Sequence, residues 1–231
     1  QNGLTQIHQN NMASFVGPNI VTDGLILDLD AGSERSYPGS GTTWTDLSSS
    51  GYEATMSNMT ASNWVTYNGV KAFETTDASN QGFRVASFPF PQSGRTYEIW
   101  LNSKSFAISW QTWFDDGATE RVLFGTPLND MRVYPSNTFS AGLVAGEWYQ
   151  LLYTMVGGAG SAVVGYKNGA SIGTGTYGYA LTAGPGTLYI LGDLGTETTS
   201  CYCSIARVYD RVLTAAEVLQ NYNAQRTRFG L

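Results

Sequence analysis

The feature of this chain that most constrains its fold is a succession of short apolar segments, most of them four to eight residues long and bounded by Gly, Asn, Asp or Pro. Short segments at this spacing, with turn residues between them, are typical of strands in a β-sandwich. The predicted strands are 24–30, 53–56, 70–74, 82–85, 97–102, 106–114, 120–124, 131–134, 148–155, 162–167, 188–191 and 203–209. The sequence therefore predicts an all-β fold.

Glycine after Asp or Asn marks two tight turns between the predicted strands. These turns are Asp115-Asp116-Gly117 and Lys167-Asn168-Gly169. Glycine adopts the positive φ that a short hairpin turn needs, so each triplet predicts a hairpin.

One helix is predicted, after the last strand. Thr214 and Glu217 have the spacing of a capping box, in which each residue satisfies a backbone N–H of the other. Leu213 and Val218 stand where a hydrophobic staple closes over the first turn. We expect a short helix from Ala215 to Asn223 and no other helix of substantial length.

The charge of the chain excludes some partners. Charged residues make up only 13% of the 231 residues, and the formal net charge is -6. Such a chain offers no basic face for a phosphate backbone, so nucleic acid is not an expected partner. It also contains no run of about 18 apolar residues, which excludes insertion into a membrane as a helix.

The two cysteines, Cys201 and Cys203, are two residues apart on a predicted strand, so both side chains point to the same side. A disulfide between such close neighbours would be strained. The favoured interpretation is two small apolar side chains in a sheet, with a strained or intermolecular disulfide as the alternative.

The first 23 residues differ from the rest. They are polar and rich in Asn and Gln, with few apolar residues. We expect 1–23 to be an extended arm, ordered by contact with another subunit, and 24–231 to be one sandwich domain. The residues singled out in this assembly arm are Gln1, His8, Phe15 and Pro18. Because the chain begins with Gln1, we also expect it to be a processed product or part of a longer protein.

Several motifs, in order, resemble laminin G-like domains of the concanavalin A-like superfamily. They are GLILDLDAG at 24–32, WTDLS at 44–48, YEIW at 97–100, GEWY at 146–149, YKNG at 166–169 and IARVYDRVLTAAEV at 205–218. The resemblance extends from Thr22 to Asn223. It implies a jelly-roll sandwich of two antiparallel sheets.

Three segments make the resemblance to known proteins more specific. The opening at 29–32, the loop at 36–44 and the closing segment at 221–231 are most similar to versions found in structural proteins of tailed phages. This implies a virion surface protein, a capsid decoration or a tail appendage. The arm would then dock on other virion proteins while the sandwich faces outward, and we expect a homo-oligomer.

Catalytic motifs are missing from the sequence. Superfamily members that hydrolyse β-glucans carry a Glu-x-Asp-x-Glu strand, since a retaining glycosidase needs two carboxylates about 5 Å apart. The nearest carboxylate pairs here are Asp28 with Asp30 and Asp115 with Asp116. The only histidine, His8, lies in the arm. We therefore expect a protein that is not an enzyme.

No cofactor is required by this interpretation, but relatives often hold calcium with Asp side chains and loop carbonyls, which are hard oxygen ligands. The candidate calcium ligands are Asp30, Asp46, Asp77 and Asp193. The alternative is that these carboxylates cap turns.

Carbohydrate recognition needs an aromatic platform with polar groups beside it. The candidate contacts are Trp44, Trp64 and Trp113, with Asp115 and Asp116. Further aromatic residues near polar ones are Trp110, Tyr177 and Tyr179, whereas Trp100 and Trp148 are expected in the core.

Three functions remain open at this point. The first is a phage virion protein that displays a lectin-like, carbohydrate-binding jelly roll. The second is a secreted carbohydrate-binding or adhesion module of a cell, which would be extracellular. The third is a glycan-active enzyme, which the missing carboxylate motif disfavours.

Overall fold

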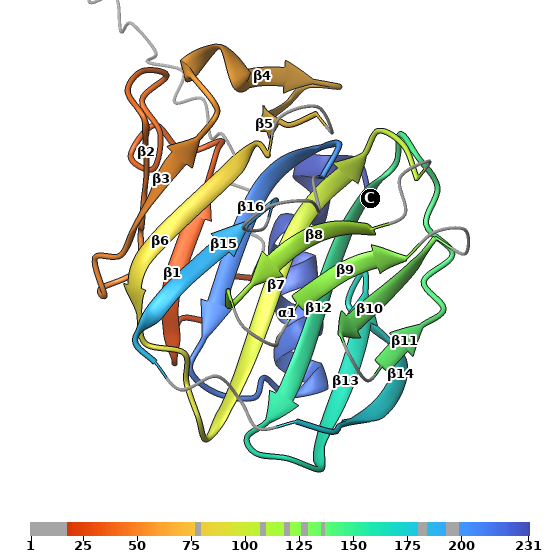
Figure 1. Ribbon diagram of the computed structural model, residues 1–231. Helices are drawn as coiled ribbons and strands as arrows, with labels where there is room; N and C mark the ends of the chain where they lie inside the picture. Colours follow the sequence, from red (N-terminus) through yellow and green to blue (C-terminus); the bar gives the residue numbers. More distant parts are fainter. Residues whose placement is uncertain are drawn as a thin grey trace, which may run out of the picture.

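The protein is a two-layer β-sandwich with a helix behind one layer (Figure 1). The computed structural model describes residues 18–76, 80–106, 110–117, 121–125, 129–134, 137–179, 184–192 and 199–231. Within these ranges all strand pairs are antiparallel and form two eight-stranded sheets. The predicted all-β sandwich with one short C-terminal helix is confirmed.

The sheet next to the helix is the back sheet. Its strand order is β14-β13-β12-β7-β16-β5-β4, and β1 also pairs with β16. Its strands are β1 (Leu25–Asp30), β4 (Trp64–Tyr67), β5 (Val70–Glu74), β7 (Gly94–Ser103), β12 (Trp148–Val156), β13 (Ser161–Lys167), β14 (Ala170–Tyr177) and β16 (Cys201–Tyr209).

The other sheet is the front sheet, which lies toward the viewer in Figure 1. Its strand order is β11-β10-β9-β8-β15-β6-β3-β2. Its strands are β2 (Thr43–Thr45), β3 (Glu53–Ser57), β6 (Gly82–Phe88), β8 (Trp110–Asp115), β9 (Arg121–Gly125), β10 (Asp130–Tyr134), β11 (Asn137–Phe139) and β15 (Gly186–Ile190).

The main core lies between the two sheets and follows from the alternation of side chains along each strand. Leu27 and Leu29 of β1 are fully buried in this core, as are Phe83 and Val85 of β6. The two cysteines also lie there as free, buried thiols, which confirms their interpretation as small apolar residues.

The helix α1 (Ala215–Gln225) begins at the predicted residue and ends two residues later than expected. The predicted capping box is present: the Glu217 N–H donates to Thr214 Oγ1 at 3.3 Å, and the Thr214 N–H donates to Glu217 Oε2 at 2.8 Å. Leu213 and Val218 are both buried in one cluster, as the staple requires. Two short 3-10 segments, η1 (Ala61–Asn63) and η2 (Arg226–Phe229), complete the described helical structure.

The helix and the tail behind it cover the outer face of the back sheet (Figure 1). Trp100 and Trp148, predicted as core residues, are buried there against Phe229, with ring centroids 4.3 Å and 5.1 Å from it. No helix in the described ranges is long and apolar enough to cross a membrane.

The last six residues of the predicted arm, 18–23, lie against this helix. Val21 is buried, and its N–H donates to Asn221 Oδ1 at 2.8 Å while its carbonyl accepts from the Tyr209 hydroxyl at 3.1 Å. These residues therefore pack as part of the domain, which corrects the expectation that the whole of 1–23 stands apart from it. Pro18 is exposed, and Gln1, His8 and Phe15 lie outside the described residues.

Candidate functional site

Two of the three tryptophans predicted as glycan contacts are core residues. Trp44 is fully buried, with its ring centroid 4.8 Å from that of Phe73 and 4.9 Å from that of Phe83. Trp113 is only 1% exposed. Neither ring can stack on a sugar without leaving the core, so the prediction is corrected for both.

The third tryptophan, Trp64, is half-buried at the end of the back sheet. Its indole N–H donates to the Ala31 carbonyl at 2.9 Å, and Lys71 Nζ lies 3.8 Å from the ring centroid. Tyr37 packs on it with ring centroids 5.6 Å apart. The ring is thus engaged by the protein's own side chains, and the structure does not place it beside the other candidate contacts.

The two aspartates predicted beside these tryptophans are also buried. Asp115 is 3% exposed and Asp116 is 8% exposed. Asp115 Oδ1 accepts from the Gly117 N–H at 2.6 Å, which makes it a turn residue at the end of β8.

Two of the four candidate calcium ligands are bonded within the protein. Asp46 accepts the N–H groups of Asp28, Ser48 and Tyr52, so it caps a turn. Asp30 pairs with Arg228, whose Nη1 lies 2.7 Å from Asp30 Oδ1. Asp77 and Asp193 lie outside the described residues. In the part of the chain that is described, no three His, Cys, Asp or Glu side chains are grouped to hold a metal ion.

A different group of side chains lies on the outer face of the front sheet. Thr55, Arg84, Tyr189 and Asp115 are register partners on the neighbouring strands β3, β6, β15 and β8. Register partners in antiparallel strands share a face. The residues beside them in sequence face the core, for example Val85. Thr55 and Arg84 of this row are exposed and point away from the core, whereas Asp115 at its end is buried.

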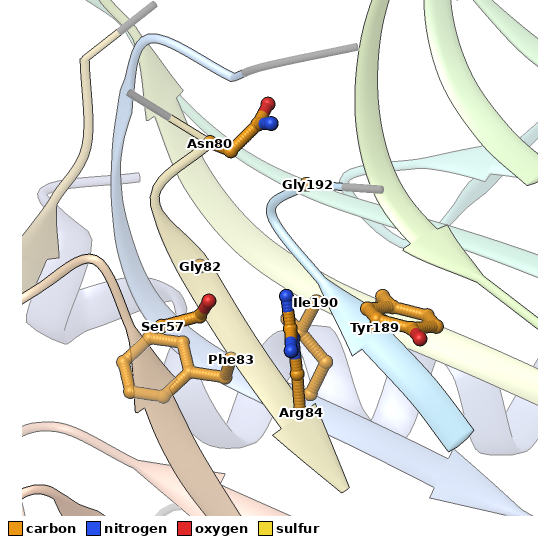
Figure 2. Close-up of a pocket in the computed structure, with 8 residues that line it drawn as sticks. All are labelled: Ser57, Asn80, Gly82, Phe83, Arg84, Tyr189, Ile190 and Gly192. Atoms are coloured by element: carbon orange, nitrogen blue, oxygen red, sulfur yellow. The ribbon is translucent and has the colours of Figure 1, made fainter. Parts of the chain in front are cut away.

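Arg84 and Tyr189, the two middle residues of this row, line a pocket (Figure 2). The Arg84 side chain lies between Ser57 and Tyr189, with Asn80 above it. Its guanidinium carbon is 5.6 Å from the centroid of the Tyr189 ring, within cation–π distance. The remaining lining residues are Gly82, Phe83, Ile190 and Gly192.

The enclosed part of the pocket is only about 10 Å³, which is room for about one water-sized group. This is less than the roughly 300–1,000 Å³ of sites that enclose a drug-sized ligand. Gly82 shapes its floor, because a Cβ at this position would lie 2.5 Å from the Ile190 carbonyl oxygen and force β6 and β15 apart. The pocket therefore suits one edge or substituent of a larger ligand that lies on the sheet.

A second aromatic and cationic group lies on the same face, at β8 and β10. The guanidinium carbon of Arg132 is 4.9 Å from the Trp110 ring centroid and 5.4 Å from that of Tyr134. Met131 and Val133, which alternate with these β10 residues, are buried in the core. Trp110 and Tyr134 thus offer ring surface on the outer face, and Tyr134 is 40% exposed.

The sequence interpretation included Trp110 among the aromatic residues near polar ones but did not select it, and it missed Arg84, Tyr189, Ser57 and Asn80. Alternation along 82–88 was the available signal, because it places Arg84 on the face opposite Phe83 and Val85. The strand order that brings Arg84 beside Tyr189 has no local sequence signal.

Comparisons with known proteins support the fold. A sequence model described as "Concanavalin A-like lectin/glucanases superfamily" matches residues 39–219. No curated protein matches the chain.

Solved structures resemble the chain at low identity. Domain 4 of the extracellular GH43 arabinanase AbnA of Geobacillus stearothermophilus, solved in complex with arabinotriose, aligns with a TM-score of 0.66 and 13% identity, over 87% of this chain and all of that domain. Trypanosoma rangeli sialidase aligns with a TM-score of 0.62 and 14% identity over 95% of this chain, but only 37% of the sialidase is covered. The binding domain of botulinum neurotoxin serotype D aligns with a TM-score of 0.63 and 11% identity, over 89% of this chain and 53% of that domain. These similarities show a shared fold.

Proposed function

Because this chain belongs to the concanavalin A-like lectin/glucanase superfamily, we propose that it is a non-catalytic carbohydrate-binding protein that uses the outer face of its front sheet. The observation that carries the proposal is the pocket in which Arg84 lies between Tyr189 and Ser57. A sugar ring stacks its apolar face on an aromatic ring, and its hydroxyls need hydrogen-bond partners. Tyr189 supplies the ring, while Ser57, Asn80 and Arg84 supply polar groups.

The lining of the pocket favours binding over hydrolysis. None of its eight residues is an Asp, a Glu or a His. A glycosidase that acts through two carboxylates needs both beside the scissile bond. Asp28 and Asp30, a carboxylate pair considered from the sequence, lie on the back sheet and not at the pocket. Each is bonded to an arginine.

A more specific proposal is that the protein is displayed on the surface of a phage particle. The resemblance of the chain to structural proteins of tailed phages supports a capsid decoration or tail appendage, anchored to other virion proteins through its N-terminal segment. A secreted module of a cell is the alternative. Co-purification with virions supports the first, and detection in uninfected cells supports the second.

A glycan-binding screen tests the central part of the proposal. The purified protein should bind at least one class of immobilised glycan without releasing any product. Tyr189→Ala should weaken that binding several-fold, up to about tenfold, because a ring contact contributes about 0.5–1.5 kcal/mol beyond its area.

Tyr67→Ala is the matched control. Tyr67 is a half-buried tyrosine on the back sheet, stacked on Tyr202 with ring centroids 3.9 Å apart. This variant should bind as the unmodified protein does. Equal weakening by both substitutions, or no binding to any glycan, would refute the proposed surface or the proposed function respectively.

A further inference from the structure

We infer that the pocket at Arg84 takes the carboxylate of an acidic sugar, so that the ligand is a glycan containing uronic or similar carboxylated residues. This inference rests on the proposed function and specifies the substrate class of the same site. Its basis is the position of Arg84, which is exposed beside Tyr189 and the pocket.

Three arginines on the side of the back sheet are paired with acidic side chains. On the side of the back sheet, Arg207 pairs with Asp28 and Arg228 pairs with Asp30. Arg211 pairs with Glu217. Arg84 forms no ion pair within the described residues, although the chain has 18 acidic residues against 12 basic ones. Because none of the described carboxylates pairs with it, the Arg84 guanidinium can bind a carboxylate from a ligand.

The surroundings of Arg84 suit a planar anion. A guanidinium binds a carboxylate through two parallel hydrogen bonds, which fixes orientation as well as charge. The Tyr189 ring limits its movement on one side, and Ser57 and Asn80 lie within the same pocket to bind neighbouring hydroxyls. The pocket admits about one water-sized group, such as one oxygen of a carboxylate, while the rest of the sugar lies on the sheet.

Charge also limits how many anionic groups the ligand can carry along its chain. The protein carries a net charge of -6, so it repels a polyanion as a whole. Screening confines the favourable interaction to groups within about 8–10 Å of Arg84 at physiological salt. A glycan with one carboxylate per sugar, or fewer, therefore fits better than a heavily sulfated chain or a nucleic acid.

The test compares a uronate-containing polysaccharide with its carboxyl-reduced form, which differs only by a neutral hydroxymethyl group in place of each carboxylate. The unmodified protein should bind the acidic form more tightly by about tenfold or more, as expected for charge-assisted hydrogen bonds. Arg84→Gln should abolish this preference. Arg84→Lys should keep part of it, because it retains the charge but loses the paired geometry.

Arg226→Gln is the matched control. Arg226 is another exposed arginine beside a tyrosine, with its guanidinium carbon 6.0 Å from the Tyr222 ring centroid, but it follows α1 on the opposite side of the molecule. This variant should keep the full preference. Binding of the carboxyl-reduced form alone, or a preference that survives in Arg84→Gln, would overturn the inference and leave carbohydrate binding intact. Absence of binding to both acidic and neutral glycans would remove the proposed function as well.

Discussion

At the scale of single residues, a buried polar network joins the back sheet to the helix that covers it. Glu98 is fully buried, and its carboxylate accepts from Trp100 Nε1 at 2.9 Å, Gln150 Nε2 at 2.8 Å and Asn221 Nδ2 at 2.8 Å. Arg207 lies beside it, with Nη1 3.7 Å from Glu98 Oε1. Buried charges are tolerated only when paired in this way.

Removing Glu98 should therefore destabilise the protein strongly. Glu98→Ala leaves the Arg207 charge with only Asp28 and leaves three buried donors without their acceptor, so we expect a loss of about 3–5 kcal/mol in the free energy of unfolding. Urea denaturation measures this. The exposed Glu147→Ala should change the stability by less than about 0.5 kcal/mol. A loss below about 1 kcal/mol in Glu98→Ala would show that the network contributes little.

Residue-level predictions from the sequence succeeded where a residue's role follows from its own strand and failed where it depends on neighbouring strands. Trp100 was expected in the core, and it is buried, on the face of the back sheet that the tail covers. Trp44 was predicted as a surface contact because sugar recognition needs an aromatic platform, but β2 pairs with β3 and the ring lies in the core. Whether this tryptophan is buried depends on the position of its strand within the sheet.

At the scale of elements, the start of α1 is fixed by local chemistry, which explains why its first residue could be predicted. Glu217 pairs with Arg211 through Nη2 at 2.7 Å and also closes the capping box. The hydrogen bonds from Arg211, which contribute most, and from Thr214 outweigh desolvation and together lower the pKa of Glu217 from 4.5 to about 2.

This shift predicts an acid-dependent loss of stability. Because the folded state lowers the pKa of Glu217, its carboxylate stabilises the protein above the unfolded pKa near 4.5, and this contribution is lost as the pH falls toward 2. Glu217→Gln should therefore be less stable than the unmodified protein at pH 7 by about 1 kcal/mol, and the difference should shrink below pH 4. Thermal melting at both pH values tests it; a difference that is constant with pH would contradict the assignment.

The elements missed from the sequence are four short or weakly patterned strands: β2, β4, β11 and β14. The segment of β14 is rich in small residues, and it forms a strand because its glycines accept close neighbours. A Cβ at Gly173 would lie 2.9 Å from Phe139, and one at Gly175 would lie 1.8 Å from Asn137 Oδ1. Packing between β11 and β14, and not strand propensity, explains this strand.

At the scale of the whole molecule, the two sheets have different outer faces. The outer face of the back sheet is covered by α1 and the tail, whereas the front sheet presents Arg84, Tyr189, Arg132 and Trp110 on its outer face. The sequence predicted the sandwich and its helix but not this face. The row from Thr55 to Asp115 joins residues more than a hundred positions apart, and only the strand order brings them together.

The most direct test of the central claim is an NMR titration of the isotopically labelled protein with a glycan that it binds. If the outer face of the front sheet is the binding surface, the perturbed signals should gather at β3, β6 and β15, with Ser57, Arg84 and Tyr189 among the largest shifts. Signals of α1 should stay unchanged. Perturbations centred on α1 or around Trp64, with none at Arg84 and Tyr189, would contradict the account.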